Sequence, residues 1–387
     1  MIKTPYFLIS EKKLKANIDS FQNALDKIWP NSKLAYSVKT NSLPWLLKYL
    51  HKHNVMAEVV SDEEYKLAQL CGYDDKNIIF NGPIKGEQLL KDSLLKKTYV
   101  NVDAENDLKC IRSVKPDGAI IGIRVNVDPK VFKDNDIGYQ QEGFRFGFSE
   151  KNEQFRKALE IVQEYSTNTK LGLHLHCNSI TRSLDVYRSI ARYAAELIRK
   201  YKLKITYIDI GGGFFGGVEG KPSAEEYISV IKEELEKEID IKKTQLVLEP
   251  GSAIIGSVVD LYTSVLDVKD TDYARIVTTD GSRIHIDPLW AKQSYMYTIK
   301  AKKMTKPFPK QIICGYTCMD HDRLMSIEDK PELIVGDEIV YHRVGAYSMT
   351  FGGMFIRYYP DVYVQMEDEL EKVRSYGTVE DYFKIHS

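Results

Sequence analysis

The sequence lacks a large excess of charge of either sign, because 54 Lys and Arg residues nearly balance 55 Asp and Glu residues. Such a chain has no general attraction for nucleic acid or for an anionic membrane surface. It also lacks any uninterrupted apolar run approaching the roughly 18 residues that a membrane span needs. Its first residues, Met1–Tyr6, lack the long apolar core of a signal peptide. We therefore expect a cytoplasmic protein that binds neither nucleic acid nor membrane.

Cysteine is scarce, and an odd number scattered along a long chain argues against a disulfide framework. Cys314 and Cys318 have three residues between them, but no second cysteine pair completes a zinc site. The thiols are therefore interpreted first as ordinary buried or free cysteines, and no metal is expected. The five cysteines are Cys71, Cys110, Cys177, Cys314 and Cys318.

Between about residues 33 and 249, short apolar runs alternate with longer amphipathic ones. Several of the short runs are continuously apolar and rich in Val and Ile, which is typical of strands buried on both faces. Ser223–Glu226 has the pattern of a helix capping box. Eight strands, each followed by a helix or crossover, predict an α/β fold with a (β/α)₈ (TIM) barrel, although a doubly wound open sheet also alternates. The predicted strands are 33–38, 55–60, 77–80, 98–102, 119–125, 170–176, 205–210 and 244–249.

After about residue 254 the pattern changes to strands separated by Gly, Pro and Asp turns, without comparable helices between them. We expect a C-terminal all-β domain there, completed by the N-terminal segment. An amphipathic helix precedes the barrel, with Ser10 as its N-cap. The predicted domains are a barrel at 29–254 and a β domain made of 1–28 and 255–387, with strands near 258–269, 275–279, 311–315, 338–344 and 361–364.

Functional groups of a (β/α)₈ barrel gather at the C-terminal ends of its strands. Lys39 follows the first predicted strand, where a buried ammonium is costly unless it is paired or neutralised. Lysine is also the residue that forms Schiff bases with carbonyl compounds, although Lys39 could instead extend to solvent. The groups at predicted strand ends are Lys39, Glu58, Asn81, Gly82, Arg124, Asn126, His174, His176, Gly211–Gly213 and Glu249–Ser252.

The Gly211–Gly213 run follows the seventh predicted strand. Bare backbone N–H groups bind anions, and a phosphate site after strands seven and eight recurs in barrels. Gly251 and Ser252 can add donors from the neighbouring loop. A purely structural turn would use the same glycines.

His174 and His176 share one face of the sixth predicted strand. Because no carboxylate or cysteine lies at matching ligand spacing, stacking on a planar cofactor is favoured over a metal site. Glu249 could hydrogen-bond a protonated ring nitrogen, or it could pair with Arg124 or Lys39. Together an amine, a phosphate cradle, a stacking ring and a carboxylate are what pyridoxal 5′-phosphate (PLP) requires.

The same residues resemble motifs of the alanine-racemase-like fold of PLP enzymes (fold type III), and within it the diaminopimelate/ornithine decarboxylase group. The resemblance runs over nearly the whole chain. Its motifs are Tyr36–Asn41, Arg124–Asn126, Phe146–Gly147, His174–Ser179, Asp209–Phe214, Glu249–Gly251, Gly315–Cys318 with Asp322 and Arg323, and Gly345–Tyr347.

The resemblance implies a PLP-dependent amino-acid decarboxylase that forms a homodimer with active sites at the subunit interface. Cys318 and Tyr347 would come from the partner's β domain, and Cys318 would return a proton to the substrate carbon after carbon dioxide leaves. Lys39, His176 and Cys318 are the candidate catalytic residues. Candidate substrate-binding residues are Met319, Asp322, His285 and Phe355. Candidate cofactor-binding residues are Lys39, Glu58, Arg124, His176, Ser179, Gly211, Gly212, Gly213, Glu249, Gly251, Ser252 and Tyr347.

The chain departs from these motifs at several positions. Ser252 replaces the arginine of Glu-Pro-Gly-Arg, which removes a cation from the phosphate site, and Asn178 replaces a glycine. Met319 stands where ornithine and diaminopimelate decarboxylases carry an acidic residue for the far amine. The segment Asp287–Ala291 lacks the arginine that diaminopimelate decarboxylases use for the distal carboxylate.

Leaving a buried charge unpaired costs kilocalories, so we expect neither meso-diaminopimelate nor ornithine as substrate. An altered far-end pocket is instead typical of relatives that act on natural-product, siderophore or polyamine intermediates. His285 in particular resembles carboxynorspermidine decarboxylases.

Two alternatives remain open. An amino-acid racemase has the same fold, but alanine racemases pair the ring nitrogen with arginine, so Glu249 favours decarboxylation. A non-catalytic PLP-binding or regulatory protein is the second alternative. Single-barrel PLP-binding proteins lack a C-terminal β domain and inactive decarboxylase relatives have usually lost cofactor contacts, so the β domain and Lys39 favour an enzyme.

Overall fold

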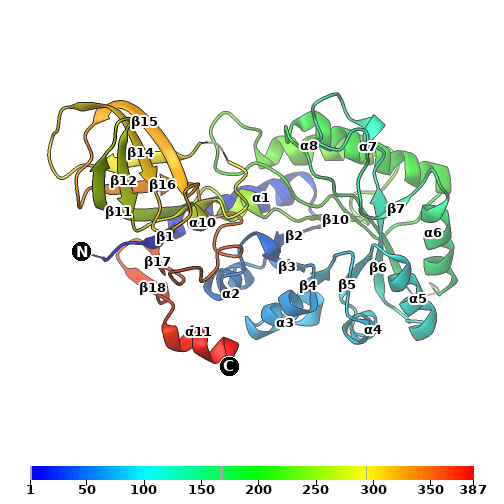
Figure 1. The fold of residues 1–387 in the computed structure, drawn as a ribbon. Helices are drawn as coiled ribbons and strands as arrows, with labels where there is room; N and C mark the ends of the chain where they lie inside the picture. The colour runs from blue at the N-terminus through cyan, green and yellow to red at the C-terminus, as the bar shows by residue number, and fades with distance from the viewer. Residues whose placement is uncertain (1, 166–168, 293) are drawn as a thin grey trace. The chain divides into compact units, whose positions relative to one another are not determined.

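A computed structural model describes residues 2–165, 169–292 and 294–387. They form two compact units, shown in Figure 1: a barrel unit, Asn17–Ile254, and a β unit, Met1–Ala16 with Ile255–Ser387. The division falls inside helix α1 (Glu11–Ile28), whereas the sequence pattern suggested residue 29. Among the described residues, no helix is both long and apolar enough to span a membrane.

The eight parallel strands of the barrel unit close on themselves. Neighbouring strands pair in the order β2-β3-β4-β5-β6-β8-β9-β10, and β10 pairs with β2. Each overlaps one of the eight predicted strands, so the (β/α)₈ prediction is confirmed and the open sheet is excluded. The strands are β2 (Ser32–Ser37), β3 (Met56–Val59), β4 (Ile78–Phe80), β5 (Tyr99–Val102), β6 (Ile120–Asn126), β8 (Lys170–His174), β9 (Tyr207–Asp209) and β10 (Gln245–Leu248), with the short β7 (Phe148–Ser149) beside β6.

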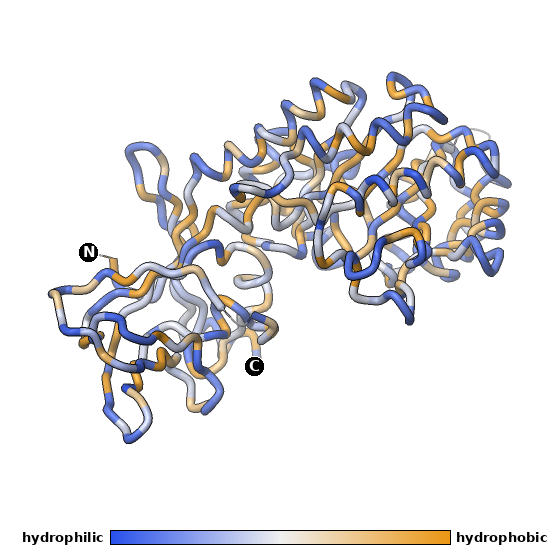
Figure 2. The backbone as a smooth tube through the Cα atoms, turned by 90° about the horizontal axis from the view of Figure 1, so that it is seen from above, coloured by the Kyte–Doolittle hydropathy of each residue, from blue (hydrophilic) through white to orange (hydrophobic). Residues whose placement is uncertain are grey.

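The helices of the barrel unit bury one face and expose the other, and Figure 2 shows hydrophilic and hydrophobic residues alternating along them. The predicted capping box is present, since Ser223 Oγ accepts from Glu226 N and the Glu226 carboxylate accepts from Ser223 N. Ser10 Oγ accepts from Lys13 N at 3.4 Å, as an N-cap does. Besides α1, the helices are α2 (Pro44–Lys52), α3 (Asp62–Leu70), α4 (Glu87–Leu95), α5 (Glu105–Val114), α6 (Gln154–Glu164), α7 (Leu184–Tyr201), α8 (Ala224–Leu235) and α9 (Ser252–Ile255).

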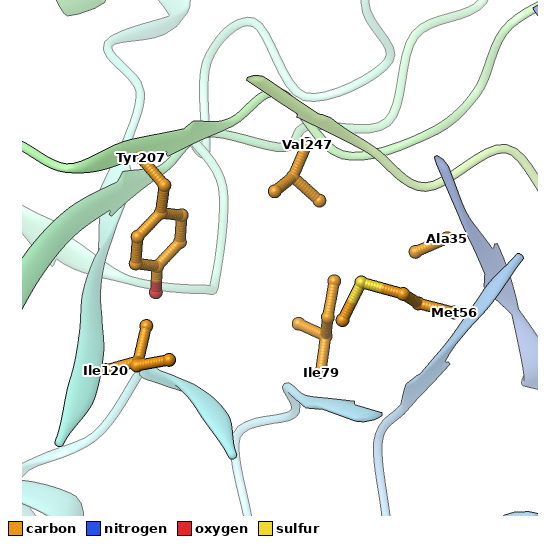
Figure 3. Packing of buried hydrophobic residues seen from close by; sticks show 6 residues of the cluster. All are labelled: Ala35, Met56, Ile79, Ile120, Tyr207 and Val247. Atoms are coloured by element: carbon orange, nitrogen blue, oxygen red, sulfur yellow. The ribbon is translucent and has the colours of Figure 1, made fainter. Parts of the chain in front are cut away.

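The ring of Tyr207, on β9, is part of a buried hydrophobic cluster of the barrel strands. A Cβ atom at Gly172 would lie 2.2 Å from this ring, and one at Gly122 would lie 2.4 Å from its hydroxyl oxygen. Two neighbouring strands therefore carry glycine because Tyr207 fills the space beside them. Figure 3 shows this layer of the core, which consists of Ala35, Met56, Ile79, Ile120, Tyr207 and Val247.

The β unit is built on one mixed sheet. Strand β1 lies between β11, to which it is antiparallel, and β17, to which it is parallel, so the two ends of the chain share a sheet. The strand order is β15-β14-β12-β11-β1-β17-β18, with β16 pairing with β11 and β13. The strands are β1 (Tyr6–Ser10), β11 (Val259–Asp270), β12 (Arg275–Thr279), β13 (Met296–Lys300), β14 (Pro307–Cys314), β15 (Arg323–Pro331), β16 (Glu338–His342), β17 (Asp361–Gln365) and β18 (Leu370–Arg374).

The β unit also contains elements that the sequence pattern did not indicate. Strands β13, β15 and β18 have few or no buried residues, and β15 and β18 are largely polar, so they lack the alternation of buried apolar and exposed polar residues by which a strand is recognised. Two helices, α10 (Arg283–Ile286) and α11 (Val379–His386), accompany the strands. The overall class, a TIM barrel with a C-terminal β domain, is nevertheless confirmed.

Candidate active site

The strand ends of the barrel place a set of polar side chains at one mouth. Lys39 lies in the 3₁₀ turn η1 (Val38–Thr40), directly after β2. The other members come from the ends of the seven further strands or the residues that follow them, and none of them is more than 7% exposed. They are Glu58, Asn81, Asn101, Arg124, His174, Asp209 and Glu249.

Lys39 is paired with Glu58, and the distance from Nζ to Oε2 is 2.6 Å. The Ser37 hydroxyl donates to the same oxygen, and Asn81 Nδ2 donates to Oε1 at 3.0 Å. Burial raises the pKa of Glu58, but the charge of Lys39 and these hydrogen bonds outweigh burial and hold the pKa below its ordinary 4.5. The amine of Lys39 is therefore held by an ionised carboxylate, although 40% of the Lys39 side chain is exposed.

Asp209 and Glu249 form a second group of acids beside His174. His174 Nε2 lies 3.7 Å from Glu249 Oε2, and all three side chains offer atoms within 4.8 Å of one another. The sequence offers no carboxylate at ligand spacing from His174 and His176, but the fold brings Asp209 and Glu249 to His174. Carboxylates distant in sequence reach it because β8, β9 and β10 are consecutive neighbours in the sheet.

Burial raises the pKa of Asp209 to about 6. Burial also raises the pKa of Glu249 well above its ordinary value, and the charges of Asp209 and Glu58 raise it further. Burial likewise lowers the pKa of His174 well below 6.5, so its ring is neutral. Near neutral pH, Glu249 therefore holds a proton beside an ionised Asp209.

A chain of amides joins the two acidic groups. Asn81 Nδ2 donates to Glu249 Oε1 at 2.8 Å as well as to Glu58. Asn101 Nδ2 donates to Asn81 Oδ1 at 2.8 Å and to Asp209 Oδ2 at 3.1 Å. The hydroxyl of Tyr207 completes the chain by donating to Asn101 Oδ1 at 2.8 Å. Because each amide is held by its neighbours, the carboxylates are fixed in position.

His176 lies against the glycine run. Its Nδ1 accepts a hydrogen bond from Gly212 N at 3.3 Å, and burial lowers its pKa to about 3, so the ring is neutral. A Cβ atom at Gly211 would lie 2.6 Å from this ring, and the φ of Gly211 is +68°, so only glycine fits without strain. Asp209 Oδ1 accepts from Gly211 N at 2.8 Å, which ties the acid to the same loop.

The predicted phosphate cradle is packed closely enough to exclude larger residues. A Cβ atom at Gly251 would come within 2.0 Å of Thr40 Oγ1. Ser252 begins α9, and its Oγ accepts from Arg182 Nη1 at 3.3 Å. Arg182 belongs to no sequence motif, and its backbone N–H donates to Ser179 Oγ at 2.8 Å. The structure thus brings together the predicted residues of this loop cluster and adds an unpredicted cation.

A cavity of about 400 Å³ opens beside His176. Arg124 lines the cavity and forms an ion pair with Asp103, with Nη1 and Oδ2 2.8 Å apart. The guanidinium groups of Arg124 and Arg145 each lie 4.5 Å from the centre of the Phe146 ring. Aromatic rings form much of the remaining wall, and no carboxylate of the described residues lines it. The cavity is suited to an apolar group, or to an anion beside the arginines, rather than to a cation.

In the β unit, the loop that carries Cys318 is wrapped around Asp322. Ser282 Oγ, Thr317 Oγ1 and Arg283 N donate to its buried carboxylate at 2.9, 2.6 and 3.0 Å. Cys318 itself is an exposed free thiol, and Met319 beside it is half-buried. Asp322, a candidate substrate-binding residue, anchors this loop through these bonds.

The other candidates of the β unit lie in two places. His285 is buried in α10, its Nε2 lies 3.5 Å from the Tyr316 hydroxyl, and burial lowers its pKa to about 4. Tyr347 and Phe355 are exposed, and Tyr347 has a φ of +57°. Both rings are therefore available to a ligand.

Residues 11–256 match the family described as pyridoxal-dependent decarboxylase, pyridoxal binding domain. The chain belongs to this family. It is 27% identical over 365 residues to a diaminopimelate decarboxylase of Archaeoglobus fulgidus, covering 91% of this chain and 85% of the relative. The corresponding enzyme of Aquifex aeolicus is 26% identical over 367 residues, covering 91% and 84%. The chain is thus a PLP-dependent carboxy-lyase that acts on an amino acid, as the sequence predicts.

Solved structures show the same fold. Diaminopimelate decarboxylase of Methanocaldococcus jannaschii in complex with L-lysine superposes with a TM-score of 0.84 at 21% identity, covering 99% of this chain and 92% of that one. Arginine decarboxylase of Paramecium bursaria Chlorella virus gives a TM-score of 0.77 at 20% identity, covering 94% and 96%. Enzymes named for different substrates therefore share this architecture, and the fold alone does not select the amino acid.

The residues present fit PLP. The glycine loops leave space that a Cβ atom would remove, and a neutral His176 ring borders them. The raised pKa of Glu249 makes its carboxyl a proton donor next to this loop. Both ring nitrogens of buried His174 have no hydrogen-bond partner among the described residues, which leaves polar capacity for a bound group.

Proposed function

We propose that this enzyme removes the α-carboxylate of an amino acid whose far end lacks the charged ammonium–carboxylate pair of meso-diaminopimelate. The observation that carries the proposal is the Arg283–Asp287 pair, with Nη2 and Oδ2 3.0 Å apart. Asp287 also accepts from the backbone N–H groups of Ala291 and Lys292. Arg283 is thus neutralised within its own segment, and a distal carboxylate would find no unpaired arginine in 283–292.

The position next to Cys318 supports the same proposal. Met319 offers a thioether where an acidic residue would bind a far amine, and the cavity beside His176 has no carboxylate among its described lining residues. A substrate ammonium placed against either surface would lose its water without gaining a partner. A neutral or anionic far end, as in some natural-product or siderophore intermediates, fits both surfaces better than the ammonium groups of a polyamine intermediate.

The roles of the barrel residues follow from their chemistry. PLP, when bound, supplies the electron sink that accepts the electron pair released as carbon dioxide leaves. Lys39 would hold the cofactor through Nζ, and Glu58 keeps that amine in place. Glu249, whose raised pKa keeps it protonated, would supply a proton donor for the cofactor ring nitrogen. His176 would pack on the cofactor ring, and Gly211–Gly213, Gly251, Ser252 and Ser179 would bind the phosphate.

The remaining roles require a second copy of the chain. We propose a homodimer in which Cys318 and Tyr347 of one subunit act in the barrel of the other, and in which Cys318 protonates the α-carbon. Mixing inactive Lys39→Ala and inactive Cys318→Ala subunits would then restore about a quarter of wild-type activity, because half of the pairs are mixed and each carries one intact site. If the mixture stayed inactive although the variants exchange subunits, shared sites would be excluded.

The test of the function is a screen for carbon dioxide release from amino acids with neutral, anionic and cationic far ends, including meso-diaminopimelate and ornithine. We expect turnover of a neutral or anionic far end and little of the two named compounds. The matched variant is Met319→Glu, which should gain activity on a cationic far end. Preferred turnover of meso-diaminopimelate would overturn the proposal, and loss of optical rotation without carbon dioxide release would indicate a racemase.

A further inference from the structure

The phosphate cradle has a position where positive charge is missing. A phosphate monoester carries about −1.5 to −2 charges near neutral pH, and backbone N–H groups neutralise only part of that charge. Ser252 follows Gly251 where the similar motif carries an arginine. The loop after β10 therefore contributes a hydroxyl and no cation, and another element must supply the charge.

Arg182 reaches this position from the loop after β8. Its Nη1 lies 3.3 Å from Ser252 Oγ, and its guanidinium lies 5.4 Å from the centre of the Phe215 ring. Among the described residues, no carboxylate forms an ion pair with Arg182. Its charge is thus uncompensated within the barrel unit, in contrast to Arg124, which is paired with Asp103.

The backbone of Arg182 is fixed from both sides. Its N–H donates to Ser179 Oγ at 2.8 Å, and its carbonyl oxygen accepts from the Tyr227 hydroxyl at 2.6 Å. Its φ is +51°, in the left-handed region that a non-glycine residue occupies at a cost of about 1 kcal/mol or more. This conformation is maintained by partners that belong to the cradle itself, namely Ser179 and the helix that follows the glycine loop.

We propose that Arg182 is a cofactor-binding residue, which supplies from the loop after β8 the phosphate-binding cation that the loop after β10 lacks. The assignment rests on the proposed placement of the phosphate at Gly211–Gly213 and Ser252. The guanidinium presents planar N–H donors that match phosphate oxygens, and Ser252, being small, leaves room for it. The side chains at 182 and 252 are therefore a compensating pair.

The test measures binding of PLP and of pyridoxal, which lacks the phosphate, to the full-length chain after the cofactor has been removed. Visible absorbance reports the covalent complex without reference to turnover. Arg182→Gln should weaken PLP binding about tenfold to a hundredfold, the range of one charge-assisted hydrogen bond, and leave pyridoxal binding unchanged. Inorganic phosphate should compete with PLP less effectively in the variant.

Lys221 provides the matched control, since its Nζ lies 5.2 Å from the centre of the same Phe215 ring without bonding to Ser252. Lys221→Gln should leave both affinities unchanged. The exchange variant Arg182→Ser with Ser252→Arg should recover most of the PLP affinity, and Arg182→Lys keeps the charge if Arg182→Gln does not fold.

Unchanged PLP affinity in Arg182→Gln, or equal losses for PLP and pyridoxal, would overturn the assignment. An equal effect of Lys221→Gln would also overturn it, because the charge would then act at a distance. If the wild type itself bound neither PLP nor pyridoxal, the proposed function would fail as well, so the two failures are distinguishable.

Discussion

The amide of Asn81 donates to Glu249 Oε1 at 2.8 Å, which joins the end of β4 to the end of β10 across the barrel mouth. The same amide donates to Glu58, the partner of Lys39. Asn81 therefore links the Lys39–Glu58 ion pair to Glu249, the acid that holds a proton. Loss of this side chain would remove the hydrogen bond that Glu58 Oε1 and Glu249 Oε1 each accept from it, although Lys39 and Ser37 would still donate to Glu58 Oε2.

Asn81→Leu should lower the free energy of unfolding of the cofactor-free protein by about 1–3 kcal/mol, since two buried acceptors lose their donor. Urea denaturation followed by circular dichroism measures the change. The control is Asn77→Leu, because Asn77 bonds only to exposed Asp74 and should change stability by no more than about 0.5 kcal/mol. Equal stability of the two variants would contradict the proposed importance of Asn81.

Lys39→Ala should abolish visible absorbance of the protein incubated with PLP, because no other amine replaces Nζ beside Glu58. Lys33→Ala removes an exposed lysine of β2, the strand that leads to Lys39, and should leave the absorbance intact. A wild-type protein that stays colourless with PLP, or a Lys39→Ala variant that keeps a reducible covalent adduct, would show that Lys39 is not the attachment site.

Cys318→Ala should keep the visible absorbance and lower turnover about a hundredfold to ten-thousandfold, the usual contribution of a general acid. Cys314, four residues earlier at the end of β14, is the control, because its Sγ donates to the Ile312 backbone carbonyl and it has no proposed role in the site. Cys314→Ala should keep most activity. Turnover that is equal in the two variants would remove Cys318 as the acid.

The titration of Asp209 makes a pH-dependent contribution to stability with an unusual sign for an acid. Burial raises its pKa from 3.8 to about 6, so the folded state binds the proton more tightly than the unfolded state. This contribution is fully present below about pH 4 and is lost as the pH rises through about 6. Relative to Asp209→Asn, the wild-type protein should therefore lose stability between pH 4 and pH 7, as urea midpoints would show.

A second acid serves as the control for this titration. Burial raises the pKa of Glu64 to about 7. Relative to Glu64→Gln, the wild-type protein should therefore lose stability up to a higher pH than it does relative to Asp209→Asn. Burial lowers the pKa values of His174 and His176, so their titration makes the protein more stable as the pH rises, which is the opposite of the effect of the two acids. Both histidines are present in every variant, so their contribution to stability cancels when a variant is compared with wild type. If the difference between Asp209→Asn and wild type did not vary with pH, the raised pKa of Asp209 would be refuted.

The barrel could be predicted from the sequence because each of its strands is an apolar run bounded by turn residues. The edges of the β unit could not, since β15 and β18 expose most of their side chains and their pairing depends on partners far along the chain. Residues that belong to sequence motifs, such as Lys39 and Glu249, were predicted at the ends of the strands that they follow in the structure.

Other parts of the site depend on tertiary contacts that no local pattern reveals. Asn101 looks like an ordinary strand residue until the closed barrel places it between Asn81 and Asp209. Arg182 follows a motif without belonging to it, and only the fold brings it to Ser252. The signal that could have pointed to Arg182 is the missing arginine at 252, because a lost cation invites a search for its replacement.

The ring of Tyr207 leaves no room for a side chain at residue 172, and the Asn101 amide oxygen together with the Tyr207 hydroxyl leaves none at residue 122. These four positions are therefore constrained to change together in evolution. We expect relatives with a larger residue at 172 to carry a smaller one at 207, and relatives with a larger residue at 122 to carry smaller ones at both 101 and 207. The identity of one aromatic residue in the interior thus restricts the sequences that two neighbouring strands can explore.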